Sequence, residues 1–202
     1  MTSGMWDERY AGRDAVWSTT PNMWVEQVAA DLPPGTALDL AAGEGRNALW
    51  LAELGWESTA VDFSSVALDR ARSWAEERLG ADASRMRTVV ADLASYEPDR
   101  TYDLVMVVYL QVPEELRRHV LRTAAMAVAP GGRLLVIAHD TANIGGGYGG
   151  PQDPAVCYSA EDIVADVAGL GLSPLRVELA RRPVSTPDGD ATALDALALL
   201  AR

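Results

Sequence analysis

The sequence contains no lysine, only one cysteine and only two histidines, and each scarcity excludes a class of chemistry. Without lysine there is no P-loop, whose lysine contacts phosphates, and no Schiff base to pyridoxal phosphate. The single cysteine, Cys157, excludes an intrachain disulfide and a multi-cysteine zinc site. With only His119 and His139 as further nitrogen ligands, we expect no metal site except one built entirely from carboxylates.

The sequence also lacks a long apolar run and an excess of basic residues. No run approaches the roughly 18–20 apolar residues that a membrane span needs. Residues 1–10 include Asp7 and Glu8 and do not resemble a secretory signal. The net charge of −12 repels nucleic acid phosphates. We therefore expect a cytoplasmic protein that binds neither membranes nor nucleic acids, with its oligomeric state left open.

The chain, 1–202, has the length of a single domain, in which 1–34 differs from 35–202. Residues 1–34 are rich in aromatic side chains, among them Trp6, Tyr10 and Trp17. This segment either closes as a lid over a ligand site or packs as ordinary core. Residues 35–202 alternate short apolar runs with amphipathic segments, which is typical of an α/β core.

The alternation predicts a doubly wound, Rossmann-like and mostly parallel seven-stranded sheet with helices on both faces. The turn around Pro187-Asp188-Gly189 predicts an antiparallel last strand, because so short a turn joins only neighbouring strands. Strands are expected at 37–41, 58–62, 86–91, 102–108, 133–138, 175–179 and 191–200. Helices are expected from Asn22, over 45–54 and 64–79, from Pro113, and over 159–171. The glycine-rich loop 145–151 is expected to be mobile.

A glycine turn follows the first expected strand, and an acidic residue ends the second. Gly43 and Gly45 allow the backbone to approach a ligand at the start of the next helix. Asp62 lies 19 residues after Gly43, which suits a carboxylate that accepts hydrogen bonds from ribose hydroxyls. The pattern Gly43-x-Gly45-x-x-Ala48 also fits the dinucleotide fingerprint, so these residues alone leave the nucleotide cofactor open.

Four segments together resemble the class I S-adenosylmethionine-dependent methyltransferases over nearly the whole chain. Asp39-Leu-Ala-Ala-Gly43-Glu-Gly45-Arg-Asn resembles their first motif, and Asp62-Phe63 their second. Ala91-Asp92-Leu93 resembles the third motif, and Pro130-Gly131-Gly132 the turn before strand five. The resemblance is strongest to the small-molecule branch of tellurite-resistance and thiopurine-type enzymes, although Ala41 stands where glycine is commoner.

This resemblance implies S-adenosylmethionine as cofactor and assigns roles to individual residues. Gly43 and Gly45 would pack on its methionine and ribose, Asp62 would hold the ribose, and Phe63 would cover the adenine. Asp92 and Leu93 would contact the adenine, and Val108 and Tyr109 would face the methyl group. The expected cofactor-binding set is Asp39, Ala41, Gly43, Gly45, Asn47, Asp62, Phe63, Ser64, Asp92, Leu93, Val108 and Trp17.

Several of these residues have a simpler interpretation. Asp62 also suits a helix cap, Asp92 a turn, and Phe63 and Tyr109 a place in the core. His139 and Tyr109 are the expected catalytic residues. His139, at the end of the fifth strand, suits a general base or a residue that positions the substrate, or else a structural histidine. Arg46 suits either an anionic substrate or, more simply, a surface ion pair.

The expected activity is therefore methyl transfer to a small-molecule thiol, metalloid oxyanion, phenol or amine. An alternative is a nicotinamide-dependent oxidoreductase, although the short-chain kind needs a Tyr-x-x-x-Lys motif that a lysine-free chain cannot supply. A further alternative is a protein that binds S-adenosylmethionine without catalysis.

Overall fold

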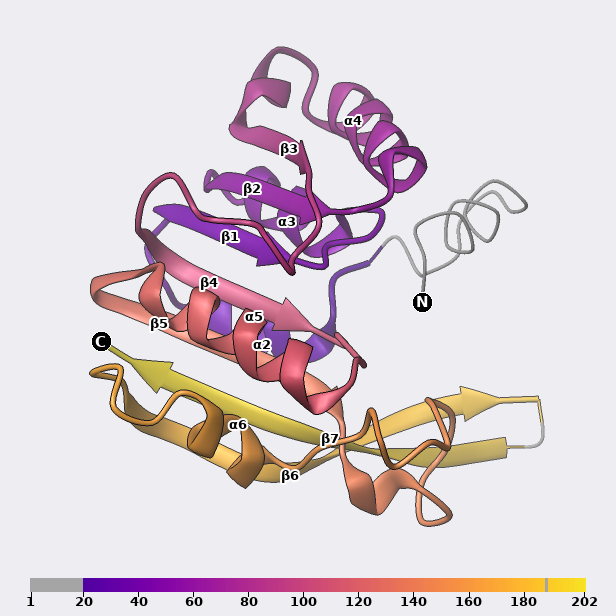
Figure 1. The fold of residues 1–202 in the computed structure, drawn as a ribbon. Helices are drawn as coiled ribbons and strands as arrows, with labels where there is room; N and C mark the ends of the chain where they lie inside the picture. The colour runs from indigo at the N-terminus through magenta and orange to yellow at the C-terminus, as the bar shows by residue number, and fades with distance from the viewer. Residues whose placement is uncertain (1–19, 188) are drawn as a thin grey trace.

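The computed structural model describes residues 20–187 and 189–202. Its centre is a seven-stranded sheet in the order β3-β2-β1-β4-β5-β7-β6 (Figure 1). The strands are β1 (Thr36–Leu40), β2 (Glu57–Asp62), β3 (Met86–Val90), β4 (Tyr102–Val108), β5 (Val128–His139), β6 (Ser173–Thr186) and β7 (Gly189–Ala201). β1 to β5 pair in parallel, and β7 runs antiparallel to both β5 and β6. The predicted doubly wound sheet with an antiparallel last strand is confirmed.

Helices cover both faces of this sheet. They are α2 (Met23–Ala29), α3 (Arg46–Glu53), α4 (Ser65–Leu79), α5 (Glu114–Met126) and α6 (Ala160–Asp166), with short 3-10 turns η1 (Gly80–Arg85) and η2 (Thr141–Asn143). One core, around Leu104 and Met106 of β4, packs under α2 and α3. The opposite core, around Val105 and Val107, packs under α5 and α6. In Figure 1, α5 lies in front of the sheet and α2 behind it.

The helix starts follow local chemistry that is readable in the sequence. The Asn22 side chain accepts from the Trp24 amide, and Ser64 accepts from the Ala67 amide, so both act as N-caps. Ser159 and Asp162 form a reciprocal capping box at the start of α6. These contacts satisfy backbone donors that a helix leaves unpaired in its first turn.

The structure corrects the expected boundaries of four elements. β5 begins at Val128 rather than at residue 133, because its pairing with β4 continues across Pro130-Gly131-Gly132 through an irregular register. α6 ends at Asp166 instead of continuing to Gly171. β6 and β7 are longer than the runs 175–179 and 191–200, because hairpin pairing continues from Ser173↔Ala201 to Thr186↔Gly189.

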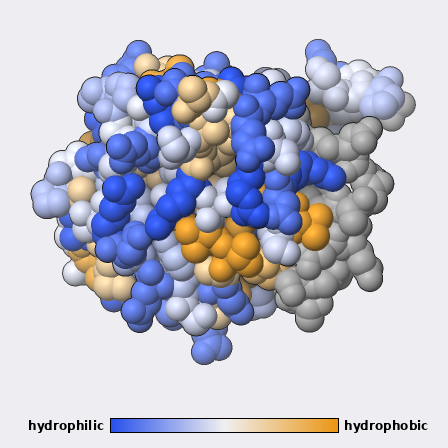
Figure 2. Space-filling model, turned by 90° about the horizontal axis from the view of Figure 1, so that it is seen from above, coloured by the Kyte–Doolittle hydropathy of each residue, from blue (hydrophilic) through white to orange (hydrophobic). Residues whose placement is uncertain are grey.

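The surface above β3 is mainly hydrophilic, with a hydrophobic patch near its middle (Figure 2). β3 is an edge strand, and its Arg87 is exposed and paired with Asp99. Charged residues on an edge strand discourage pairing with another chain. No helix in the described part of the chain is long and apolar enough to cross a membrane.

Candidate functional site

Two strained residues mark the edge where the two central strands end. Ala41 follows β1 with a φ of 60°, and Tyr109 follows β4 with a φ of 58°. Residues with a side chain rarely adopt this left-handed conformation, which costs roughly 1–2 kcal/mol each. Chain order reverses between β1 and β4, and doubly wound folds bind their ligands at such a switch point. The strain therefore lies where the fold predicts a site.

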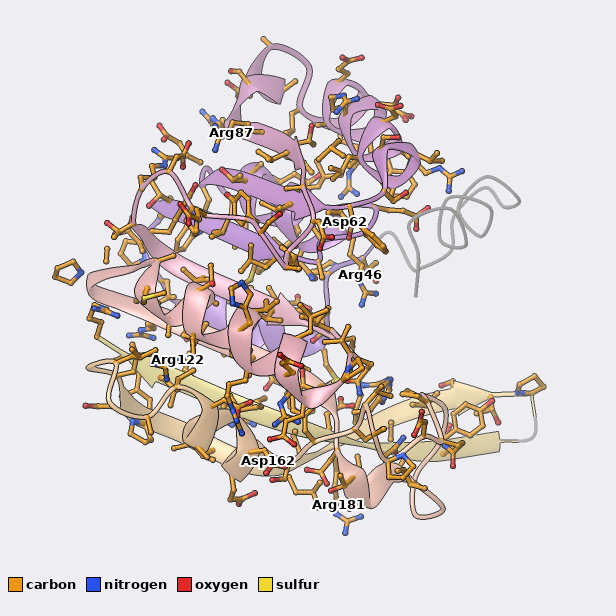
Figure 3. All side chains as sticks on the ribbon, in the orientation of Figure 1. Arg46, Asp62, Arg87, Arg122, Asp162 and Arg181 are labelled. Carbon is orange, nitrogen blue, oxygen red and sulfur yellow. The ribbon has the colours of Figure 1, made fainter. Side chains whose placement is uncertain are left out.

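Asp62 at the end of β2 organises the glycine turn beside this point. Its Oδ2 accepts from the Gly43 amide at 2.8 Å, and its Oδ1 accepts from the Ser64 amide at 2.9 Å. One carboxylate thus fixes the turn after β1 and the N-terminus of α4. Figure 3 shows Asp62 and Arg46 at the carboxyl ends of the strands, whereas Arg87 and Arg122 lie toward the other end of the sheet.

Gly45 serves packing as well as conformation. Its φ is 71°, and a Cβ at this position would lie 2.6 Å from Met86 Cε and 3.0 Å from Ala71 Cβ. The turn therefore needs glycine so that α3 can pack closely against α4 and β3.

Asp39, near the carboxyl end of β1, is a buried carboxylate. Its exposure is 1%, and neither oxygen has a partner among the described residues. Burial raises the pKa of Asp39 to about 7, while nearby Arg46 acts in the opposite direction and Asp62 adds to the rise. An unpaired buried carboxylate is costly, and such groups cluster at functional sites. Asp39 therefore suits a cationic ligand group at this edge.

The remaining predicted cofactor residues differ in their surroundings. Phe63 is half-buried and belongs to none of the described core clusters, so a purely core role does not describe it. Asp92 is exposed and accepts from the Ala94 amide at 2.9 Å, which is the contact of a turn residue. Half-buried Leu93 and Val108 pack on opposite cores. Asn47 accepts from the Asn22 amide at 2.9 Å and so fixes the start of α2 to α3.

A second polar cluster surrounds Asp195 of β7, which is fully buried. Its Oδ2 accepts from Trp24 Nε1 at 2.9 Å, the Tyr109 hydroxyl at 2.9 Å and Arg182 Nε at 2.7 Å. Its Oδ1 lies 3.7 Å from Nδ1 of His139. The structure thus joins Tyr109 and His139, the two predicted catalytic residues, through a carboxylate that the sequence analysis did not select.

The rings of His139 and Tyr109 stack with their centroids 4.8 Å apart. Burial lowers the pKa of His139 below its ordinary value and Arg182 adds to this, while Asp195 acts in the opposite direction. The histidine is therefore neutral at neutral pH, as a general base requires. Burial, with the charge of Asp195, raises the pKa of Tyr109, so its hydroxyl stays protonated and donates to the carboxylate.

Arg46, the first residue of α3, departs from the expected surface ion pair. It is half-buried and has no hydrogen bond or ion pair to any residue that the structure describes. Burial lowers its pKa, and the charge of Arg182 adds to this, whereas Tyr109 and Asp39 act in the opposite direction. The arginine therefore contributes positive charge near Asp39 of β1 and near the cluster around Asp195.

The glycine-rich loop makes hydrogen bonds to neighbouring segments. Asn143 is fully buried, its amide nitrogen donates to the Gly149 carbonyl at 2.8 Å, and its amide oxygen accepts from the Leu194 amide. The Tyr148 amide also donates to the Thr192 carbonyl. The bonds to Leu194 and Thr192 connect this loop to β7, and its expected mobility stays a prediction.

The comparisons with known proteins bear on the same edge of the sheet. Residues 37–132, which contain the glycine turn, Asp39 and Asp62, match the family model described as a methyltransferase domain. Residues 37–132 thus belong to the class I S-adenosylmethionine-dependent methyltransferase family.

Solved structures share the fold of this methyltransferase chain. TehB from Haemophilus influenzae superposes with a TM-score of 0.73 at 18% identity, covering 92% of this chain and 63% of that one. The N-methyltransferase NodS from Bradyrhizobium japonicum superposes with a TM-score of 0.72 at 16% identity, covering 100% and 99%. Identities this low show a common fold only.

A curated relative matches part of the methyltransferase chain. It is the 2-heptyl-1-hydroxyquinolin-4(1H)-one methyltransferase of Mycobacteroides abscessus, 28% identical over 121 residues. The match covers 58% of this chain and 52% of that protein, so the chain matches about half of the relative's length.

The remaining predictions for this methyltransferase have separate outcomes. Trp17 and most of the expected lid lie outside the described residues, so these predictions stay untested. His119 is exposed on α5, and Cys157 is buried with a free thiol. Among the residues described, no group of three histidine, cysteine or acidic side chains is placed to hold a metal.

Proposed function

We propose that this chain transfers a methyl group from S-adenosylmethionine to a small-molecule nucleophile. The observation that carries the proposal is Asp39, a buried carboxylate at the switch point of a methyltransferase fold, whose oxygens have no hydrogen-bond partner in the described part of the chain. S-adenosylmethionine carries a sulfonium and an ammonium group at its methionine end, and both are cations. A cation beside Asp39 would restore the ionised carboxylate and remove the cost of leaving it unpaired.

The residues along this edge fit the rest of the cofactor. Gly43, in the left-handed region at φ 55°, brings backbone close to the space beside Asp39 and Ala41. Asp62 would hold the ribose and Phe63 would cover the adenine. Asp92 and Leu93 would border the adenine, and Val108 would face the methyl group.

The cofactor supplies an electrophilic methyl group on sulfur, so the protein's task is alignment and exclusion of water. Asp39 and the glycine turn would hold the methionine end against the sheet edge. The Tyr109 ring and His139 would border the acceptor, which must approach from the side opposite the sulfur. A neutral His139 would take the proton of an acceptor that is protonated at working pH.

The acceptor proposed for first trial is a hydroxylated aromatic or heteroaromatic ring. Two observations favour it over the other small molecules considered above. The curated relative is named for a hydroxyquinolone, and the Tyr109 and His139 rings offer stacking surfaces beside the expected methyl position. Thiols, metalloid oxyanions and amines belong in the same panel.

Isothermal titration calorimetry with S-adenosylmethionine, S-adenosylhomocysteine and NAD tests the cofactor. We expect both sulfur compounds to bind and NAD not to bind, whereas binding of NAD alone would refute the proposal. Mass spectrometry of an acceptor panel then tests turnover. Binding without methylation of any phenol, hydroxyquinoline, thiol, amine or tellurite would favour a protein that binds the cofactor without catalysis.

A further inference from the structure

Asp195 is the only charged residue in the apolar run 191–200, yet it is fully buried. It pairs directly with His139 across the antiparallel β5–β7 ladder, so the two side chains lie on the same face of the sheet. A buried carboxylate needs several donors, and Asp195 has three on its Oδ2. These donors, from three separate parts of the chain, hold the carboxylate in one orientation.

The other oxygen, Oδ1, faces His139. Nδ1 of His139 is buried and has no hydrogen-bond partner among the residues that the structure describes, and Oδ1 is 3.7 Å away. A lone pair on Nδ1 would face a negative oxygen and be repelled, whereas a proton on Nδ1 would be attracted. The neutral imidazole therefore favours Nδ1–H, which leaves the lone pair on Nε2.

The ring has little freedom to turn away from this arrangement. Tyr109 stacks on it, and a Cβ added to Gly150 would lie within 2.7 Å of its Cγ, so the loop backbone packs against it. The His139 amide donates to Gln111 Oε1 at 2.9 Å. In the described part of the chain, the charged or titratable groups facing the ring are Asp195 from β7, Arg182 from β6 and Tyr109 after β4.

We infer that Asp195 is a positioning residue that fixes His139 as the Nδ1-protonated tautomer, with Nε2 available to take a proton from the acceptor. The inference rests on the proposed function, because it gives His139 a reaction to serve. In that step the nucleophile uses its electron pair to bond the methyl carbon, and the carbon–sulfur pair returns to sulfur. The acceptor proton moves to Nε2, and Asp195 balances the imidazolium charge.

A general base at His139 restricts the class of acceptor that the site would serve. A base is useful only for a nucleophile that still carries its proton at neutral pH. The site therefore suits a phenol, an N-hydroxy group, a thiol or an amine, and gains nothing from its base with an acceptor that is already an oxyanion.

Nitrogen-15 NMR of the imidazoles tests the inference without turnover. The chain has only two histidines, and exposed His119 is an internal reference. In the parent we expect His139 to carry its proton on Nδ1, and in Asp195→Asn to shift toward the Nε2–H tautomer with a lower pKa. Asp103→Asn, which alters a carboxylate bonded to Thr36, should leave His139 unchanged. A parent His139 protonated on Nε2 overturns the inference, whether or not the variant folds.

Kinetics separates this inference from the proposed function. With an active acceptor, Asp195→Asn should lower kcat by about 10²–10⁴-fold and move the acidic limb of the pH–rate profile. Binding of S-adenosylmethionine should change little in this variant. Failure of the parent to bind the cofactor refutes the proposed function, whereas an unchanged tautomer and pH profile in Asp195→Asn refutes the role of Asp195.

Discussion

At the scale of single residues, the site combines costs that the rest of the fold must offset. The backbone of Ala41 and Tyr109 is left-handed, and buried Asp39 has no hydrogen-bond partner within 20–187 and 189–202. Each feature destabilises the cofactor-free chain, and all three lie at the carboxyl ends of β1 and β4. Binding of a cation at this edge would relieve at least the electrostatic cost.

The raised pKa of Asp39 predicts a specific dependence of stability on pH. A folded pKa of about 7 against an ordinary 3.8 means that folding favours the protonated acid. Protonated Asp39 therefore contributes fully to the unfolding free energy below about pH 4. This contribution, up to about 4 kcal/mol, is lost as pH rises through about 7. In Asp39→Asn this loss is absent, so the unfolding free energy of the variant minus that of the parent should increase with pH.

Urea denaturation between about pH 4 and about pH 8 measures this difference. Asp103→Asn is the control, because its carboxyl is largely exposed and the hydrogen bonds from Thr36 lower its pKa. Its difference from the parent should not increase over the same range. A constant difference for Asp39→Asn would mean that Asp39 is ionised in the folded protein.

The strain at Ala41 predicts that glycine is more stable there. Ala41→Gly removes the left-handed penalty but adds backbone freedom to the unfolded chain, so we expect a net gain of about 0.5–1 kcal/mol. Ala42→Gly is the matched control, since Ala42 is not among the residues with positive φ, and it should lose stability. Urea denaturation of both variants checks the prediction, which a less stable Ala41→Gly would contradict.

The sequence revealed one half of the site better than the other. The glycine turn and Asp62 are close in the chain and follow strand ends, so spacing alone placed them together. Asp195 comes to His139 only through the register of β7 against β5, which the sequence does not specify. The sequence shows Asp195 as a single acidic residue inside an apolar strand. Whether it contacts a catalytic residue depends on which strand pairs with β7.

At the scale of elements, local caps were predictable and element lengths were not. Ser64 and the Ser159–Asp162 pair mark helix starts through contacts within three residues. Where β5 begins and how far the β6–β7 hairpin extends depend on pairing between strands. Tertiary contacts of this kind decide element boundaries, and the sequence patterns do not contain them.

A buried ion pair joins α5 to α6. Arg117 Nε donates to Asp166 Oδ2 at 2.7 Å, both side chains are almost fully buried, and Arg118 and Arg122 add bonds to Asp166. Asp166→Ala would leave Arg117 buried without its partner, so we expect a loss of about 3–5 kcal/mol of unfolding free energy.

The matched control for Asp166→Ala is Glu114→Ala, which removes an exposed partner of Arg118 and should cost less than about 1 kcal/mol. Chemical denaturation of both variants gives the two values. Equal losses would show that burial of the Arg117–Asp166 pair is unimportant for the packing of α5 against α6.

At the scale of the whole molecule, the sheet has a continuous centre and a projecting end. β1, β4 and β5 have a strand on each side, and their central residues are fully buried. The β5–β7 pairing ends at His139↔Asp195, so β6 and β7 continue beyond it with only each other as strand partners (Figure 1). The Asp195 cluster therefore lies where the full sheet gives way to the two-stranded extension.

This arrangement predicts a gradient of amide hydrogen exchange. Opening the extension breaks few buried contacts, so amides at 184–186 and 190–191 should exchange at least about 100-fold faster than those of Val105 to Val107 in β4. Leu194 should be intermediate or slow, because its amide donates to buried Asn143 and its carbonyl accepts from the Asp140 amide. Exchange followed by NMR at neutral pH measures each amide separately.

Asn143→Ala distinguishes anchoring of the extension from the intrinsic stability of the hairpin. Loss of the Asn143 side chain removes the bonds to Leu194 and Gly149, so exchange at Leu194 should accelerate while β4 stays protected. Because His139 pairs with Asp195, the residue next to Leu194, the same variant should loosen the contact between them. Uniform acceleration over the whole sheet would instead mean that the extension and the centre unfold as one unit, with no separate boundary at Asp195.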